Sequence, residues 1–437
     1  MAYDIIIGRN ESDKKDLGKN GLISIGKSYV KMGQYTSLSN PIYMDIARSH
    51  VILVAGKRGS GKSYSLGVLA EELSNLPKEV AQNISSLIFD TMGIYWTMKY
   101  KNEKDKKLLE DWNLKTKNLP VKIFVPYGHY KSYIEKGIPV DKQFALDATE
   151  MKPEDWILMF SLEIISPVAV LIQRTISKLM QEKNRIIIQD IIKELEQDKL
   201  NSLETKNAAI GLFEAADTWG IFAKSSTEVT QVKDLISAGE TTILDLSVYN
   251  SVGAFNVRAL AISLLSKKIF NERMDARKSE EIKSISRGLD LMTRTEKKEI
   301  PLIWIFIDEA HEFLPMEGKT VATDALVQIL REGRQPGISI VLATQQPGQI
   351  HRDVMTQSDL VIAHRVTSKI DVESLNNIMQ SYLLESVKRY MDELPSERGA
   401  AIILDDNSER IYPMRVRPRF TWHGGEAPSA VKIKKEL

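Results

Sequence analysis

The most constraining feature of this sequence is a glycine-rich segment at residues 56–63, which reads GKRGSGKS. It matches the pattern G-x-x-x-x-G-K-[ST]. An apolar run, Val51–Ala55, comes directly before it, and an amphipathic stretch from Tyr64 to about Leu76 follows it. A strand, a glycine loop and a helix in this order open an α/β unit. The sequence therefore predicts a phosphate-binding loop at the start of such a unit.

The chemistry of this loop follows from its residue types. Glycines allow backbone N–H groups to curl around the β-phosphate of a nucleotide, and the N-terminus of the next helix adds positive potential. Lys62 is expected to reach the β- and γ-phosphates, and the Ser63 hydroxyl to ligate Mg²⁺. We therefore predict ATP and Mg²⁺ as cofactors. The residues expected to bind them are Gly56, Arg58, Gly59, Ser60, Gly61, Lys62, Ser63, Tyr64 and Asp90.

A second candidate segment is the apolar run Leu302–Ile307, which ends in two acids. Asp308 is expected to hold Mg²⁺ through water, and Glu309 to be the general base for an attacking water. The pair therefore favours hydrolysis over a simple binding switch. The alternative is an acid pair that is merely exposed and solvated. His311 completes the letters DEAH, but no second helicase core accompanies it, so we interpret His311 as incidental.

Two polar residues follow other predicted strands. Gln345 comes after the strand Ile338–Ala343 and is suited to sense the γ-phosphate and orient water, although it could be an ordinary loop residue. Asp90 ends the strand Ser86–Asp90, from which it can reach the nucleotide side of the sheet.

Two arginines are candidates for stabilising the charge that develops on a transferred phosphoryl group. Arg331 and Arg334 lie at i, i+3 near the end of the predicted helix Thr323–Glu332. They could act within one subunit or across a subunit boundary. Ordinary surface salt bridges are the other interpretation.

Further short apolar runs predict the strands of one mostly parallel sheet. They are residues 86–90, 121–125, 241–246, 302–307, 338–343, 360–363 and 400–404. Helical periodicity prevails between Val125 and Thr241, and a long helix is expected from Phe255 to about Asn271. The charged segment Glu272–Glu299 is interpreted as a solvated helix end followed by a flexible loop. The tail Arg410–Leu437 holds seven Lys or Arg against two Glu, which favours an extended arm over the domain or a neighbour.

Composition excludes several classes of protein. Cysteine is absent, so disulfide scaffolds, thiolate nucleophiles, Cys-ligated zinc and iron–sulfur clusters are ruled out. The 59 Lys and Arg nearly balance the 58 Asp and Glu, so any attraction to nucleic acid must come from local patches. No apolar run approaches the roughly 18 residues of a membrane span. We therefore expect a cytoplasmic protein without a membrane anchor.

Together, several motifs resemble the HerA-like branch of the HerA/FtsK ATPases, which are hexameric DNA translocases with a RecA-like core. The motifs occur in the same order across residues 50–425 and read GKRGSGKS, IFDTMG, ILDLS, IDEAHEFLP, REGRQPGISIVLATQQP and VRPRFTWHGG. The resemblance implies an α/β RecA-like P-loop core in two parts, 49–125 and 239–409. It also implies a small N-terminal β module at 1–48, an inserted helical bundle at 126–238 and a C-terminal brace at 410–437.

The same resemblance implies a homohexamer with nucleotide at the subunit interfaces, double-stranded DNA in a central pore and a nuclease or other effector as partner. An arginine that acts in trans is expected just before the first core strand, where Arg48 is the candidate. We interpret the chain as an ATP-hydrolysing motor on double-stranded DNA. A ring scaffold that gates an effector, for instance in antiviral defence, and a packaging or conjugation motor are the alternatives. A small-molecule kinase would leave Glu309 and Gln345 without a shared role.

Overall fold

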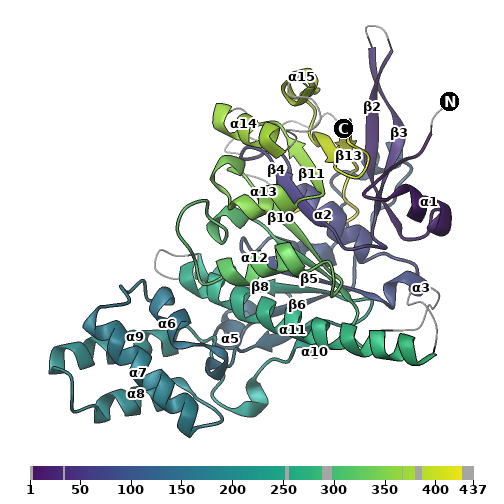
Figure 1. Cartoon of the computed structure of the whole chain (residues 1–437). Helices are drawn as coiled ribbons and strands as arrows, with labels where there is room; N and C mark the ends of the chain where they lie inside the picture. Colours follow the sequence, from purple (N-terminus) through teal and green to yellow (C-terminus); the bar gives the residue numbers. More distant parts are fainter. Residues whose placement is uncertain are drawn as a thin grey trace.

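A single twisted sheet forms the framework of the molecule (Figure 1). The computed structural model describes residues 3–32, 35–250, 255–287, 298–366, 368–378 and 386–425. Within these residues the sheet has thirteen strands in the order β1-β3-β2-β13-β12-β11-β4-β10-β9-β5-β8-β6-β7. The α/β fold expected from the sequence is therefore confirmed.

Eight strands form the parallel part of the sheet. Their residues are almost all buried because helices cover both faces, which explains why they appear in the sequence as continuous apolar runs. They are β4 (Val51–Ala55), β5 (Ile84–Asp90), β6 (Val121–Pro126), β7 (Lys142–Phe144), β8 (Thr241–Asp245), β9 (Leu302–Ile307), β10 (Ile338–Thr344) and β11 (Leu360–His364). Each predicted parallel strand is present, with ends that differ by up to two residues.

The remaining strands extend the sheet beyond β11, mostly in antiparallel pairing. They are β12 (Ala400–Asp405), β13 (Arg410–Val416), β2 (Leu22–Met32), β3 (Tyr35–Asp45) and β1 (Ile5–Ile7). β13 joins β12 to β2, with Met414 opposite Ser28, so the N-terminal strands continue the central sheet. The first part of the basic tail, expected as an extended arm, is thus a strand of this sheet. Residues 426–437, to which the rest of that expectation applies, lie outside the described residues.

Helices on the two faces of the sheet enclose two hydrophobic cores. Helix α2 (Lys62–Leu73) packs in the same core as buried side chains of the N-terminal strands β1, β2 and β3. The other face carries α11 (Phe255–Arg287), α12 (Thr323–Glu332), α13 (Arg352–Gln357), α14 (Lys369–Ile378) and α15 (Ser386–Glu393), as Figure 1 shows. Short helices in the connections are α1 (Glu11–Leu17), α3 (Lys78–Ala81), α4 (Lys106–Asp111), α5 (Tyr130–Glu135) and α10 (Val232–Leu235).

Four helices form a bundle beside the sheet, in the lower left of Figure 1. They are α6 (Pro153–Met159), α7 (Pro167–Glu182), α8 (Ile188–Gln197) and α9 (Leu203–Thr218). Trp156 and Phe213, both buried, contact each other in its interior. Ser166 and Ser202 cap α7 and α9, because each hydroxyl accepts a backbone N–H in the first helical turn. The helices lie within the predicted insertion at residues 126–238, whose boundaries stay a prediction.

Helix α11 is longer than the sequence suggested, because it ends at Arg287 and not near Asn271. The charged part of this helix starts with a buried anchor. The Arg273 guanidinium donates to the carbonyl oxygens of Pro336 and Ile300, both at 2.7 Å. It also forms an ion pair with Glu280, two helical turns further along α11. The expected loop at residues 288–297 lies outside the described part of the chain. Among the described helices, none is long and apolar enough to cross a membrane.

Candidate functional site

The strand order brings three predicted site segments to one edge of the sheet. β10 lies between β4 and β9, and all three run parallel, so their carboxyl ends are adjacent. The phosphate-binding loop follows β4, Asp308 follows β9 and Gln345 follows β10. Open parallel sheets bind ligands at this edge. We call it the carboxyl edge.

The conformation of the phosphate-binding loop requires its glycines. Gly61, the N-cap of α2, has φ 111°, which is in the left-handed region. A Cβ added to Gly56 would lie 2.4 Å from Ser60 Oγ and 2.7 Å from His364 Cβ. Ser60 Oγ is itself buried and has no hydrogen-bond partner among the described residues. Arg58 lies exposed at the tip of the loop, and its charge acts to lower the pKa of Glu309.

Lys62 is the one cation of the loop that is buried, with 5% of its surface exposed. Its Nζ donates to the carbonyl oxygen of Lys57 at 3.3 Å. Burial lowers the pKa of Lys62, while the nearby carboxylates of Glu309 and Asp308 act in the opposite direction. The lysine and both acids therefore share one electrostatic site.

The two acids after β9 differ in their surroundings. Asp308 is 1% exposed; its Oδ1 accepts the backbone N–H of Glu309, and its Oδ2 accepts the Tyr95 hydroxyl at 3.3 Å. Glu309 adopts φ 50°, and its buried Oε2 has no hydrogen-bond partner in the described chain. Burial and the adjacent Asp308 raise the pKa of Glu309 to about 7. The pair is therefore enclosed, and the alternative of an exposed, solvated pair is wrong.

His311 is more closely connected than the sequence indicated. Its Nδ1 lies 3.3 Å from Thr344 Oγ1, at the tip of β10, and 3.6 Å from Glu309 Oε2. Burial and the Lys62 charge lower the pKa of this histidine, so the neutral form is favoured. His311 thus links the acid segment to the strand end that carries Gln345, which is half-buried.

Asp90 occupies the predicted strand end, but its carboxylate is already fully engaged. Oδ1 accepts the backbone N–H groups of Met92, Gly93 and Ile94, and Oδ2 accepts that of Tyr95 at 2.8 Å. Burial, together with the charge of the adjacent Asp245, raises the pKa of Asp90. The structure therefore corrects the expectation of a direct nucleotide contact: Asp90 folds the loop that presents Tyr95.

Tyr95 is the residue that this loop brings to the site. Its hydroxyl lies 3.3 Å from Asp308 Oδ2 and 3.4 Å from the carbonyl oxygen of Ser63. The ring is buried. The two residues expected to hold Mg²⁺ are thus connected through one side chain.

Tyr64 also differs from the prediction. Its hydroxyl accepts the backbone N–H of Arg419 at 2.7 Å, and its ring meets that of His423 edge to face at 5.2 Å. The side chain therefore packs against the C-terminal segment and away from the phosphate-binding loop. A helix position three residues after Gly61 turns to another side of α2, which a linear motif does not reveal.

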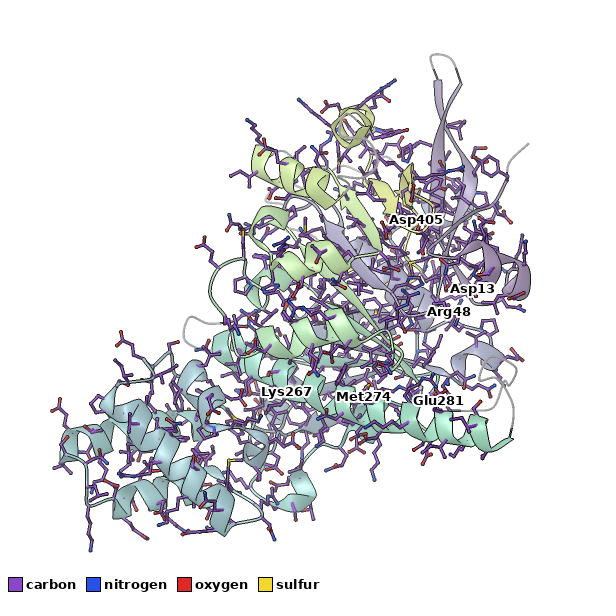
Figure 2. All side chains as sticks on the ribbon, in the orientation of Figure 1. Asp13, Arg48, Lys267, Met274, Glu281 and Asp405 are labelled. Carbon is purple, nitrogen blue, oxygen red and sulfur yellow. The ribbon has the colours of Figure 1, made fainter. Side chains whose placement is uncertain are left out.

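The three candidate arginines lie at the opposite edge of the sheet, where the parallel strands begin. Arg48 precedes β4 and pairs with Asp13 at 2.8 Å; Figure 2 labels both residues. Arg331, in the last turn of α12, pairs with Asp353 at 2.7 Å. Arg334 follows α12, and its charge helps to lower the pKa of Asp13. We call this the amino edge. None of the three arginines is brought to the phosphate-binding loop of its own chain.

Two groups of residues near the site were missed from the sequence. His364 ends β11 beneath the phosphate-binding loop. Glu71 of α2 is fully buried and accepts hydrogen bonds from the guanidinium groups of Arg417 and Arg419, each at 3.0 Å. The sequence did carry a signal for each group. His364 is a polar residue at the end of an apolar strand, and Arg417 and Arg419 are spaced to lie on one face of an extended segment.

Two protein-family models match parts of the chain. The family model described as "Helicase HerA, central domain" matches residues 29–269, and the model of the zonular occludens toxin (Zot) matches residues 241–378. The DNA double-strand break repair helicase HerA of Pyrococcus furiosus is 23% identical over 201 residues, which are 42% of this chain and 34% of that protein. The probable DNA double-strand break repair helicase HerA of Methanocaldococcus jannaschii is 30% identical over 94 residues, which are 21% of this chain and 19% of that protein.

Similarity to solved structures extends over more of the chain. VirB4 of Thermoanaerobacter pseudethanolicus superposes with a TM-score of 0.54 at 11% sequence identity, covering 90% of this chain and 96% of that one. At this identity the match establishes the fold alone. The alignments to the two sequence relatives span about a third and a fifth of their respective lengths.

Proposed function

Since this chain belongs to the HerA central-domain family, whose model matches more than half of it, and is a HerA-like P-loop ATPase, we propose that it is a ring-forming motor that hydrolyses ATP to translocate on double-stranded DNA. The observation that carries the hydrolysis is the buried Oε2 of Glu309, which has no hydrogen-bond partner in the described chain and lies near Lys62 and Asp308. The names of the two relatives, both double-strand break repair helicases, support DNA as the track.

The residues at the carboxyl edge fit a nucleotide with Mg²⁺. Ser60 Oγ is a buried polar atom without a hydrogen-bond partner in the described residues, so the loop offers a position for a hydrogen-bonding group from outside the protein. Ser63 and Asp308 supply a hydroxyl and a carboxylate, which are the oxygen ligands that Mg²⁺ prefers. These two residues would hold the metal, which would supply positive charge to offset the negative charge of the phosphates.

The proposed mechanism assigns one task to each side chain. Lys62 donates to phosphate oxygens, and Gln345 orients the attacking water. Glu309 takes the proton of that water through Oε2 while the water oxygen bonds to the γ-phosphorus. The bond between this phosphorus and the bridging oxygen to the β-phosphate breaks, and ADP leaves with the electron pair. A base with a pKa near the working pH is effective in such a transfer.

The amino edge supports the ring in this proposal. Because Arg48, Arg331 and Arg334 lie where the strands begin, a role on the γ-phosphoryl requires the site of a neighbouring subunit. Arg331 is the preferred candidate, since its helix ends with the guanidinium largely exposed. A homohexamer in the cytoplasm, with a nuclease or another effector as partner, completes the proposal and is supported by family resemblance.

The ATPase rate with and without long duplex DNA tests this function, with the mass of the protein measured in the same buffer plus nucleotide. We expect a ring-sized species whose rate rises at least several-fold with DNA. A ring that hydrolyses ATP at the same rate without DNA would contradict translocation and favour a scaffold that gates an effector. A protein that hydrolyses no ATP under either condition would contradict the motor altogether.

A further inference from the structure

One histidine lies directly beneath the phosphate-binding loop and was not part of any motif. His364 is the last residue of β11 and has no exposed surface. Its Cβ would lie 2.7 Å from a Cβ added to Gly56, and its ring atom Cε1 would lie 3.5 Å from one added to Gly61. The histidine therefore contacts both the first glycine of the loop and the glycine at the start of α2.

The hydrogen bonds of His364 define its protonation. Nδ1 lies 3.1 Å from the carbonyl oxygen of Ala400, which can only accept, so Nδ1 carries the proton. Nε2 lies 2.8 Å from Ser65 Oγ and accepts a hydrogen bond from this hydroxyl. Burial lowers the pKa of His364 to about 4, and the nearby Lys62 charge adds to this effect. The imidazole is therefore neutral and present as a single tautomer near pH 7.

Ser65 places this hydrogen bond next to the phosphate-binding lysine. It lies in the first turn of α2, three residues after Lys62, and is almost completely buried. The backbone of the loop is held by the same strand tips, since Lys57 N–H donates to Arg365 O at 3.1 Å and Gly56 N–H to Thr344 O at 3.3 Å. His364 adds the side-chain connection between the floor of the loop and the helix.

We propose that His364 is a positioning residue that holds the phosphate-binding loop and the first turn of α2 in the arrangement that receives ATP. This inference rests on the proposed function and deepens it. Groups fixed before the ligand arrives lose less conformational entropy on binding, so a prepared loop binds ATP more tightly. Without the histidine, the loop would have to become ordered when the nucleotide binds.

Four variants test the proposal through the Kd for a fluorescent ATP analogue with Mg²⁺, measured on the full chain. His364→Leu removes both hydrogen bonds at similar volume, and Ser65→Ala removes one of them. Each should raise Kd, by about tenfold and about fivefold, since a lost hydrogen bond to a buried group has effects of this order. The double variant should resemble His364→Leu alone, because the two residues act through one bond. His364→Gln, which keeps an acceptor for Ser65, should restore most of the affinity.

Ser74→Ala is the matched control. It also removes a hydroxyl hydrogen bond from α2, to Thr241 Oγ1, but at the end of the helix far from the loop. Thermal unfolding without nucleotide separates affinity from stability. If His364 had a merely structural role, its variants would have a lower Tm but the same Kd as the Ser74→Ala control. A folded His364→Leu variant with normal Kd, or effects that multiply in the double variant, would overturn the proposal.

The same titration separates this inference from the proposed function. If the unmodified protein binds no ATP analogue, the result contradicts the proposed function, whatever the position of His364. If it binds and all His364 and Ser65 variants bind equally, only the inference fails. Should His364→Leu not fold, Ser65→Ala alone decides, and unchanged affinity in that variant contradicts the proposal.

Discussion

The two edges of the parallel sheet differ in how completely their polar groups are paired. At the carboxyl edge, Glu309 Oε2 and Ser60 Oγ are buried without a partner in the described residues. At the amino edge, His50 lies between Asp45 and Asp359, with ring nitrogens 3.3 Å and 2.6 Å from their carboxylates. Buried polar groups are normally satisfied, so open groups beside a phosphate-binding loop fit a site that receives a ligand. The carboxylates around His50, in contrast, are paired within the protein.

At the amino edge, a network of charged groups surrounds His50. Asp45 accepts hydrogen bonds from Arg9, whose guanidinium also donates to backbone carbonyls of Gly18 and Asn20. Burial alone would lower the pKa of His50, but the hydrogen bonds to Asp359 and Asp45 raise it to about 9. The network therefore carries a buried cation that connects the N-terminal strands to β4.

Lys62→Ala should have the largest effect, because it removes the buried cation of the open edge. We expect loss of ATP hydrolysis by at least about 100-fold, since removal of one group that stabilises transition-state charge costs about this much. Steady-state ATPase assays measure it. Lys78→Ala, at an exposed lysine of the short helix α3, is the control and should stay close to the unmodified rate. Similar losses in both variants would show that the effect is not specific to the site.

Glu309→Gln should separate binding from chemistry at the same edge. The variant should bind ATP but hydrolyse it about 10²- to 10³-fold more slowly, because an amide cannot take the proton of the attacking water. Single-turnover hydrolysis and nucleotide binding are measured side by side. Glu332→Gln, at an exposed position of α12, serves as control. Normal turnover by the Glu309 variant would remove it as the base.

Arg331→Ala tests whether the amino edge is only structural. As a residue that acts in trans it should lower the ATPase rate about 10²-fold or more, whereas loss of its surface salt bridge with Asp353 alone should change little. An equal mixture of Arg331→Ala and Lys62→Ala subunits should recover part of the activity, because some interfaces keep both intact residues. A mixture as inactive as its components would argue against a shared site.

The smallest expected effect concerns stability and pH. The pKa of His50 is raised to about 9 in the folded state from an ordinary 6.5, so its contribution is complete below about pH 6.5 and is lost as pH rises through 9. The groups that face it are Asp45 and Asp359, with Arg9 behind Asp45. Denaturant unfolding at pH 6.5 and 9 should show the free energy of unfolding falling, and less so in His50→Gln. An equal fall in both proteins would assign the pH dependence to other groups.

The carboxyl edge could be predicted because its parts are contiguous in sequence. Lys62, Asp308 and Gln345 each follow an apolar run that had to be a strand, and parallel strands end together. Their catalytic roles stay predictions until the variants are measured. The sequence also indicated the buried environment of the acids correctly, since six apolar residues precede them.

The rest depends on contacts between residues that are distant in sequence. His50 and Asp359 are 309 positions apart, and Ser65 and His364 are 299 apart, so no local pattern signals either pair. Asp90 was predicted to contact the nucleotide because it ends a strand at the nucleotide side of the sheet, but its carboxylate accepts hydrogen bonds from four backbone N–H groups. The predicted end of helix α11 was too early, because the contacts that bury Arg273 come from Ile300 and Pro336, which are distant in sequence.

The contact between Glu71 and the two arginines has a consequence for biosynthesis. Glu71 is buried in the helix that follows the phosphate-binding loop, and its partners Arg417 and Arg419 are made some 346 to 348 residues later. Until those residues leave the ribosome, α2 would carry a carboxylate with no cation to accompany it into the core. The nucleotide-binding unit, although encoded near the start of the chain, should therefore acquire its final packing only after residue 419 has been translated, and a nascent chain arrested earlier should remain sensitive to protease around α2.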